Sequence, residues 1–233
     1  MDITKNIKEI NEQIHHAELD YQRLPSSVKL LAVSKGHSIA AIKTAAKCGL
    51  RCFGENYIQE AIPKINSLKN YSLEWHFIGK LQSNKTKMIA ENFDWLQSLD
   101  RIDLARKLNS QRPSELPPLN VCIEVNICEE QNKGGIICNQ LIETAQEIRS
   151  LPNLRLRGLM TIPEFTSNSD NQFKIFKKMK QLYEMLFQQG FELDTLSMGM
   201  SHDFIAAIAC GSTMVRLGQA IFGIRQPKGG IIE

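Results

Sequence analysis

The stretch that decides the fold is residues 28–35, Val28-Lys29-Leu30-Leu31-Ala32-Val33-Ser34-Lys35. It has the apolar character and length of a buried strand and ends on a lysine. Ser38 follows as a candidate helix N-cap, and apolar residues recur at helical spacing up to Gly49, a residue typical of helix ends. A strand that leads through a short loop into a helix is one β–α unit. Upstream, residues 2–23 predict an additional amphipathic helix.

The same unit recurs along the whole chain. Strands are predicted at residues 28–35, 52–56, 73–79, 94–99, 119–127, 154–162, 195–199 and 214–218. Each but the last is clearly followed by a helical segment, and such alternation favours a parallel sheet. Eight units in 233 residues come close to the roughly 250 residues of one (β/α)8 barrel. We therefore expect an α/β fold, a single TIM barrel domain over residues 1–233, with an extra N-terminal helix and a loose tail at 226–233.

Composition and charge narrow the function classes. The formal net charge is +3, and the Lys/Arg-rich stretches at 80–87 and 174–180 are short and mixed with apolar residues. This pattern favours solvated helix faces over a nucleic-acid interface. No segment approaches the roughly 18 apolar residues that span a membrane, and the N-terminus lacks the apolar run of a signal peptide. We expect a cytoplasmic protein that binds neither nucleic acid nor membrane, and a monomer, because one barrel of this length buries its own core.

The cysteines give no sign of a disulfide or a metal site. The six thiols form no C-x-x-C pair and stand at no zinc spacing with a histidine. Reduced, mostly buried cysteines are the usual state in a cytosolic protein. We expect neither a disulfide nor a bound metal.

Candidate chemistry lies where barrel enzymes place it, at the carboxyl ends of the strands. Lys35 ends the first strand and shares a face with Leu31 and Val33. If that face is the barrel interior, desolvation lowers the lysine pKa and suits it for a Schiff base; the alternative is a lysine that emerges into solvent. Asn56 ends the second strand, and His76 lies in the third, where a hydrogen-bonded core histidine is the alternative.

The last two units carry a candidate phosphate site. Ser201 stands at the start of a helix after the seventh strand, and Gly218 follows Arg216 in the eighth. Helix amides and a glycine that admits close approach suit an anion, and barrels often bind phosphate after strands seven and eight. Two ordinary glycine-rich turns are the alternative. Together with the lysine of the first strand, these loops indicate a phosphorylated aldehyde as ligand.

Glu124 poses a separate question. It shares a strand face with Cys122 and Asn126, and if it points into the barrel it needs a partner, because an unpaired buried charge is costly. Lys133 and Arg157 are both candidates, and the sequence does not choose between them.

Ordered motifs along nearly the whole chain resemble one known family, the pyridoxal 5'-phosphate (PLP)-binding, vitamin B6 homeostasis proteins of the YggS/PROSC type. The motifs are residues 31–35 (LAVSK), 53–57 (FGENY), 75–79 (WHFIG), 81–85 (LQSNK), 157–160 (RGLM), 196–201 (LSMGMS) and 214–216 (MVR). The resemblance implies a barrel like the N-terminal domain of alanine racemase, without the second domain of the racemase.

The resemblance also implies roles for individual residues. Lys35 matches the Schiff-base lysine. Ser201, Gly218 and the following Gln219 match phosphate-binding positions, and Arg216 matches the arginine that faces the pyridine nitrogen. Asn56 and His76 match polar positions around the cofactor. The family commonly has threonine where this chain has Gln219, so the backbone N–H can still serve the phosphate while the hydroxyl contact is in doubt.

An arginine at the pyridine nitrogen has a chemical consequence. Arginine keeps its proton in proteins, so Arg216 would donate to an unprotonated ring nitrogen and leave the ring a poor electron sink. The resemblance implies a PLP carrier or regulator without catalytic turnover, with apo-PLP enzymes as candidate recipients and indirect effects on amino-acid and keto-acid balance. Two alternatives stay open: a PLP-dependent amino-acid racemase, which needs a second base opposite Lys35, and a Schiff-base aldolase without PLP.

Overall fold

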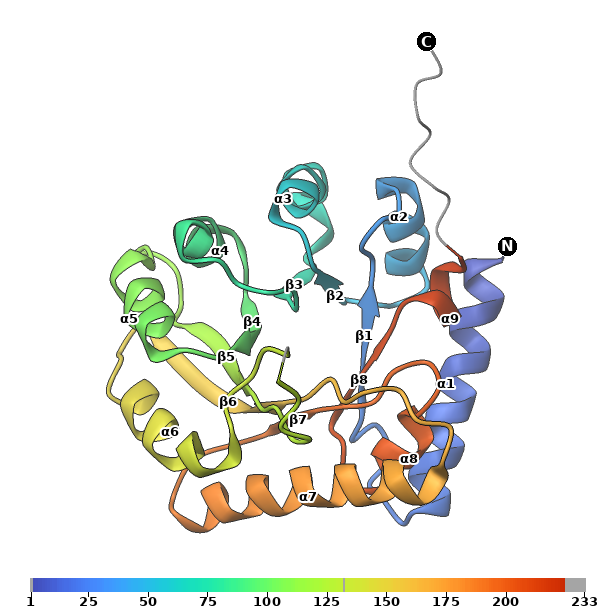
Figure 1. Ribbon diagram of the computed structural model, residues 1–233. Helices are drawn as coiled ribbons and strands as arrows, with labels where there is room; N and C mark the ends of the chain where they lie inside the picture. The colour runs from blue at the N-terminus through green and yellow to red at the C-terminus, as the bar shows by residue number, and fades with distance from the viewer. Residues whose placement is uncertain (1, 132, 225–233) are drawn as a thin grey trace.

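The computed structural model describes residues 2–131 and 133–224, and among them it shows a closed barrel of eight parallel strands ringed by helices (Figure 1). The strands are β1 Lys29–Val33, β2 Cys52–Glu55, β3 Glu74–Phe77, β4 Trp95–Leu99, β5 Leu119–Glu124, β6 Leu154–Met160, β7 Thr195–Ser197 and β8 Met214–Leu217. Each strand pairs with the next, and β8 closes the barrel on β1. The predicted (β/α)8 barrel is confirmed.

Helices connect consecutive strands, as the alternating pattern predicts. They are α2 Ile39–Lys47, α3 Ile58–Ser67, α4 Thr86–Asn92, α5 Ile102–Gln111, α6 Leu141–Arg149, α7 Ser169–Gln188, α8 Phe204–Ala209 and, after β8, the short α9 Gln219–Phe222. No helix in the described part of the chain is both long and apolar enough to cross a bilayer.

The predicted additional helix is α1, Ile3–Asp20, which runs alongside α8 and α9 where the barrel closes (Figure 1). Asp2 caps it by accepting from the Lys5 amide at 3.1 Å. Ile7, Ile10 and Ile14 recur on one face and are buried. The Asn6 side chain donates to the Ile221 carbonyl at 2.9 Å, so α1 also holds the segment after β8.

Apolar side chains fill two different spaces. The main core lies between the strands and the helices and includes outward-facing strand residues such as Phe53 and Phe77. Inside the barrel, two small apolar clusters are separate from this core: Leu31, Ile78 and Met214 in one, Trp95, Cys122 and Met160 in the other. The rest of the interior is therefore open to polar side chains.

Several predicted strands are too long at their carboxyl ends. The first ends at Val33, not at Lys35, and a turn follows in which Gly36 has a φ of +76°, a conformation that glycine adopts without strain. Asn56 likewise follows β2 instead of ending it. Asn126 lies beyond β5, where its amide donates to the Glu130 carbonyl at 2.8 Å and so fixes a loop. The predicted tail at 226–233 lies outside the described residues.

Candidate functional site

The carboxyl ends of β1 and β8 bring Lys35 beside the predicted phosphate-binding segment. A cavity of about 280 Å³ is lined by Lys35 and Val33 from one side and by Gly218 and Gln219 from the other. The two strands are paired up to Ala32 and Leu217, so the loops that follow them must lie together. A Cβ at Gly218 would stand 3.0 Å from the Val33 carbonyl oxygen, which explains the need for glycine where β8 passes β1.

A buried charge cluster holds the backbone on both sides of Lys35. The Lys64 ammonium donates to the Ser34 carbonyl at 2.8 Å, and the Glu60 carboxylate accepts from the Gly36 amide at 2.5 Å. These two partners, from α3, therefore fix the residue before Lys35 and the residue after it.

The same cluster extends to β2. Lys64 forms ion pairs with Glu55 and Glu60, both at 2.8 Å, and the Ser34 hydroxyl donates to Glu55 at 2.6 Å. Glu55 is fully buried and Lys64 is 4% exposed. Burial raises the pKa of the Glu55 carboxyl, although Lys64 opposes this shift. Sequence reasoning missed the cluster; its only signals were the i,i+4 pair of Glu60 and Lys64 and an acidic residue within a buried strand.

Arg216 lies at the end of β8 with its side chain almost fully buried. Its NH1 donates to the Ser197 hydroxyl and its NH2 to the Thr161 carbonyl, both at 2.7 Å. Burial lowers the pKa of Arg216 to about 10, although the negative charges of Asp203 and Glu124 act to raise it. The guanidinium therefore remains a cation at neutral pH.

Ser201 lies in a turn after β7, three residues before the helix that was predicted to follow it. α8 begins at Phe204 with Asp203 at its N-cap position. The Asp203 carboxylate accepts from the Met200 amide at 2.6 Å and so braces the turn that presents Ser201. A phosphate at this turn would meet the Ser201 hydroxyl and turn amides instead of the end of a long helix.

Asn56 and His76 differ in what remains of their hydrogen-bonding capacity. The Asn56 side-chain oxygen is buried and meets no donor among the described residues. His76 lies fully buried on β3, and both its ring nitrogens have protein partners: Nε2 is 2.9 Å from Glu74 and Nδ1 is 2.8 Å from the Gln97 amide. Asn56 thus offers an acceptor to a ligand, whereas the His76 nitrogens are committed within the protein.

Neither candidate partner named from the sequence forms a hydrogen bond with Glu124. Arg157 binds Asp194 at 3.0 Å, and Lys133 donates to Glu130 at 2.7 Å. Burial, together with the nearby Asp100 carboxylate, raises the pKa of Glu124 to about 7. Glu124 is therefore a carboxyl group that gains and loses its proton near neutral pH.

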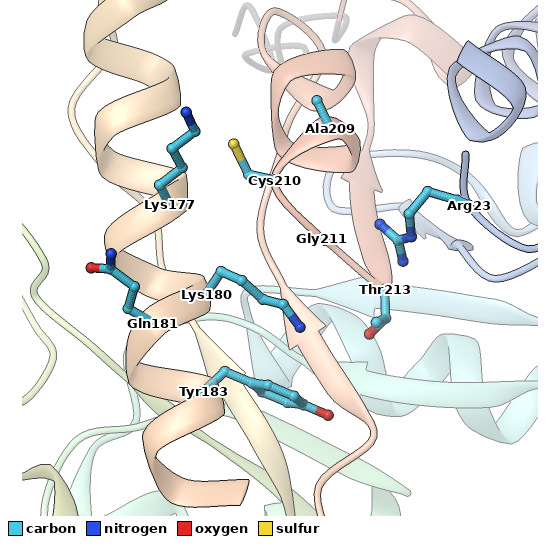
Figure 2. A pocket seen from close by; sticks show the side chains of 9 residues that line it. All are labelled: Arg23, Lys177, Lys180, Gln181, Tyr183, Ala209, Cys210, Gly211 and Thr213. Atoms are coloured by element: carbon cyan, nitrogen blue, oxygen red, sulfur yellow. The ribbon is translucent and has the colours of Figure 1, made fainter. Parts of the chain in front are cut away.

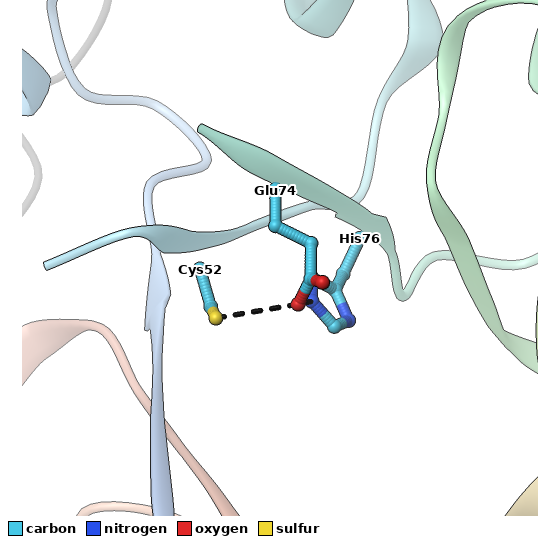
Figure 3. A group of neighbouring side chains, drawn as sticks. All are labelled: Cys52, Glu74 and His76. Carbon is cyan, nitrogen blue, oxygen red and sulfur yellow. Dashed lines mark hydrogen bonds and ion pairs between the residues drawn. The ribbon is translucent and has the colours of Figure 1, made fainter. Parts of the chain in front are cut away.

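Cys52, Glu74 and His76 are the described residues whose donor atoms are grouped closely enough to hold a metal ion, within 4.8 Å of one another (Figure 3). Their protons are already shared: the Cys52 thiol donates to Glu74 at 3.3 Å. Burial and the Glu74 charge raise the pKa of Cys52 to about 12. A metal would need the thiolate. These three side chains therefore fit a hydrogen-bonded cluster better than a metal site, and the absence of a metal stays a prediction.

The chain has a larger cavity, of about 560 Å³, which contains none of the predicted site residues (Figure 2). It lies between α7 and the segment from α8 to β8, and the cations Arg23, Lys177 and Lys180 line it. The smaller cavity fits PLP chemistry better. It offers an amine on Lys35 for the aldehyde and a glycine cradle for the phosphate, and Arg216 and Asn56 lie at the same end of the barrel.

Comparisons with known proteins identify the family of the chain. The family model described as "Alanine racemase, N-terminal domain" matches residues 3–226. Relatives named "Pyridoxal phosphate homeostasis protein" include one from Pasteurella multocida, 50% identical over 229 residues (97% of this chain, 98% of the relative). Another, from Escherichia coli K12, is 48% identical over 227 residues (96% and 97%).

Solved structures extend the comparison. PipY of Synechococcus elongatus PCC7942, with PLP bound, is 34% identical with a TM-score of 0.84, covering 95% of this chain and 100% of PipY. Alanine racemase from Clostridium difficile 630 is 15% identical with a TM-score of 0.73, covering 97% of this chain and 58% of the racemase. At that identity the racemase shows the shared barrel alone.

Proposed function

The chain belongs to the alanine racemase N-terminal domain family, alongside its pyridoxal phosphate homeostasis proteins, and from this premise we propose that it binds PLP and serves intracellular PLP homeostasis. The observation that carries the proposal is the cavity that Lys35 shares with Gly218 and Gln219. PipY, a relative with PLP bound, supports the same ligand.

Each site residue has a part in holding the cofactor. When bound, PLP supplies an aldehyde that can form a Schiff base with an amine, here Lys35. Ser201 and the amides of Gly218 and Gln219 bind the phosphate; the Gln219 side chain is exposed and contributes through its backbone. Arg216 donates to the pyridine nitrogen, and Asn56 accepts a hydrogen bond with its buried oxygen. His76 acts on the cofactor through neighbouring side chains.

The chemistry of Arg216 favours storage over turnover. A guanidinium keeps its proton at neutral pH, so the ring nitrogen opposite it stays unprotonated and draws few electrons from a bound amine. The protein then acts as a cytoplasmic, monomeric carrier that releases PLP to apo-enzymes, with indirect effects on amino-acid and keto-acid balance. Purified protein should show visible absorbance that borohydride bleaches; an aldolase without PLP would show none.

A PLP-dependent amino-acid racemase is the alternative, and Glu124 is the observation that favours it. Racemisation needs an acid–base group besides Lys35, and Glu124 is a carboxyl with a pKa of about 7, close to the optimum for proton transfer at neutral pH. Sensitive assays with separate amino-acid enantiomers distinguish the two functions. Turnover that disappears in Glu124→Gln would establish the racemase and displace the carrier.

Ser201→Ala is expected to weaken PLP binding about tenfold. The lost hydrogen bond to a phosphate dianion is worth on the order of 1–2 kcal/mol, and about 1.4 kcal/mol is one decade in Kd. Pyridoxal, which lacks the phosphate, should bind the variant as well as the wild type. Titration of apo-protein with both ligands measures the difference; an equal loss for the two would place the phosphate elsewhere.

Gly218→Val is expected to impair PLP binding more than Ser201→Ala does. Its Cβ would stand 3.0 Å from the Val33 carbonyl oxygen and 3.2 Å from the Val33 Cβ, and the larger side chain would also enter the space that the phosphate needs. Urea unfolding of the variant beside the wild type is the control, because it separates a loss of ligand binding from a loss of folding. The same titration decides, and unchanged PLP affinity in Gly218→Val would contradict the assignment.

A further inference from the structure

A chain of polar side chains crosses the barrel interior and ends at Arg216. Its first link joins the Glu74 carboxylate to His76 Nε2 at 2.9 Å (Figure 3), and its second joins His76 Nδ1 to the Gln97 amide nitrogen at 2.8 Å. The Ser197 hydroxyl then donates to the Gln97 oxygen at 2.6 Å, and Arg216 NH1 donates to the Ser197 oxygen at 2.7 Å. The links come from β3, β4, β7 and β8.

The two ends of the chain force a single direction on every hydrogen bond. A guanidinium only donates and a carboxylate only accepts. Since Ser197 accepts from Arg216, its one O–H goes to the Gln97 oxygen. The Gln97 amide nitrogen therefore faces His76 and donates to Nδ1, and the imidazole carries its proton on Nε2, toward Glu74.

The opposite direction leaves hydrogen bonds unmade at both ends. A proton on His76 Nδ1 would require the Gln97 amide to turn over and present its NH2 group to Ser197. The Ser197 oxygen could still accept from both Gln97 and Arg216, but its O–H would lose the Gln97 oxygen to which it donates. At the other end, an unprotonated Nε2 would face the Glu74 carboxylate, an acceptor opposite an acceptor. The tautomer of His76 and the orientation of Gln97 are thus coupled to the position of the guanidinium.

The hydrogen bonds that link these side chains are buried, so each of them is costly to break. His76, Gln97 and Ser197 are fully buried, between the two apolar clusters of the barrel interior, and a broken hydrogen bond in such surroundings leaves a polar group unsatisfied. Burial lowers the pKa of His76, so the imidazole is neutral. Burial would raise the pKa of Glu74, but the interaction with His76 outweighs burial and lowers that pKa, so Glu74 is an anion. The chain is a neutral bridge between an anion and a cation.

We infer that Glu74, His76, Gln97 and Ser197 are positioning residues that set the guanidinium of Arg216 toward the pyridine nitrogen of PLP, an inference that rests on the proposed function. One N–H of each terminal nitrogen of Arg216 is committed, to Ser197 and to the Thr161 carbonyl. These two bonds fix the plane and the rotation of the guanidinium, and so the direction of the N–H groups that remain for the ring.

The first test compares PLP with 1-deaza-PLP, an analogue that has a carbon in place of the ring nitrogen. The variants are Ser197→Ala and Gln97→Leu; the Gln97 side chain forms no hydrogen bond with Arg216 itself. In both variants we expect PLP affinity to fall about tenfold, or about 1.4 kcal/mol, and 1-deaza-PLP affinity to stay unchanged. Ser212→Ala is the matched control: Ser212 is equally buried, but its hydroxyl donates to backbone carbonyls. Equal losses for both ligands, or no loss for PLP, would overturn the inference.

The second test needs no cofactor. Nitrogen NMR of the apo-protein should show His76 neutral with its proton on Nε2, its signal assigned among the five histidines by its absence from His76→Gln. Gln97→Glu cannot donate to Nδ1, so both ring nitrogens should then be protonated. A wild-type proton on Nδ1 would refute the chain. If the wild type bound no PLP but its His76 proton was on Nε2, the proposed function would fail while the hydrogen-bonded row of side chains would be supported.

Discussion

Lys35→Ala protein is expected to lack the visible absorbance of a Schiff base altogether. In the wild type, borohydride reduction followed by proteolysis should give one major pyridoxyl peptide, and it should contain Lys35, because Lys35 lines the same cavity as Gly218 and Gln219. Without the amine, PLP is held only through its phosphate and ring contacts. Borohydride then fixes none of it, and mass spectrometry should find no modified peptide.

Lys80→Ala is the matched control for this experiment. Lys80 follows β3 at the same end of the barrel and is exposed, so it is an accessible amine that a non-specific aldehyde would also modify. The control variant should keep the absorbance and the Lys35 peptide. Modification mainly at Lys80, Lys85 or Lys133 in the wild type would overturn the assignment of Lys35.

Lys64→Met is expected to destabilise the fold by about 3–5 kcal/mol, the cost of removing one partner from a buried ion pair. Met fills a similar volume, but Glu55 and Glu60 lose the cation that separates them, and the Ser34 carbonyl loses its donor. Urea unfolding followed by circular dichroism measures the change. The Lys35 turn loses one of its two anchors, so PLP should also bind the variant more slowly.

An exposed pair of the same spacing supplies the control for Lys64. Lys87 and Glu91 are an i,i+4 pair at 3.7 Å with side chains 70% and 41% exposed, and such pairs contribute less than about 1 kcal/mol. Lys87→Met should therefore unfold almost as the wild type does. Equal unfolding of Lys64→Met and Lys87→Met would contradict a structural role for the buried cluster.

The loss of stability in Lys64→Met, measured against the wild type, should become smaller as the pH is lowered. Burial already raises the pKa of Glu55 above its ordinary 4.5, and removing Lys64 raises it further. In the variant the folded state then binds more protons than the unfolded state between pH 4.5 and the raised pKa, so its stability falls as pH rises through that window. Comparing unfolding at pH 5 and pH 8 tests this, and a deficit independent of pH would rule out a buried charge as its cause.

Local sequence patterns were sufficient for the architecture. A run such as residues 28–35 is apolar on both faces because a parallel barrel strand is covered by helices outside and packed within, and its repetition eight times fixes the class of fold. Predicted strands overran at Lys35 and Asn56 because side-chain alternation continues into a loop, whereas pairing stops where the backbone turns, as at Gly36.

The sequence by itself determined the barrel, the end of the barrel where ligands bind, and the two segments that meet at the cavity, since β1 and β8 must be neighbours once the barrel closes. Only the tertiary structure decided which side chains meet inside it. Gln97 and Ser197 are 100 positions apart and bond at 2.6 Å, and Glu124 is bonded to neither Lys133 nor Arg157. The physical reason is that a period of two assigns a residue to a face of its strand, whereas contacts across the interior depend on the tilt and stagger of all the strands together.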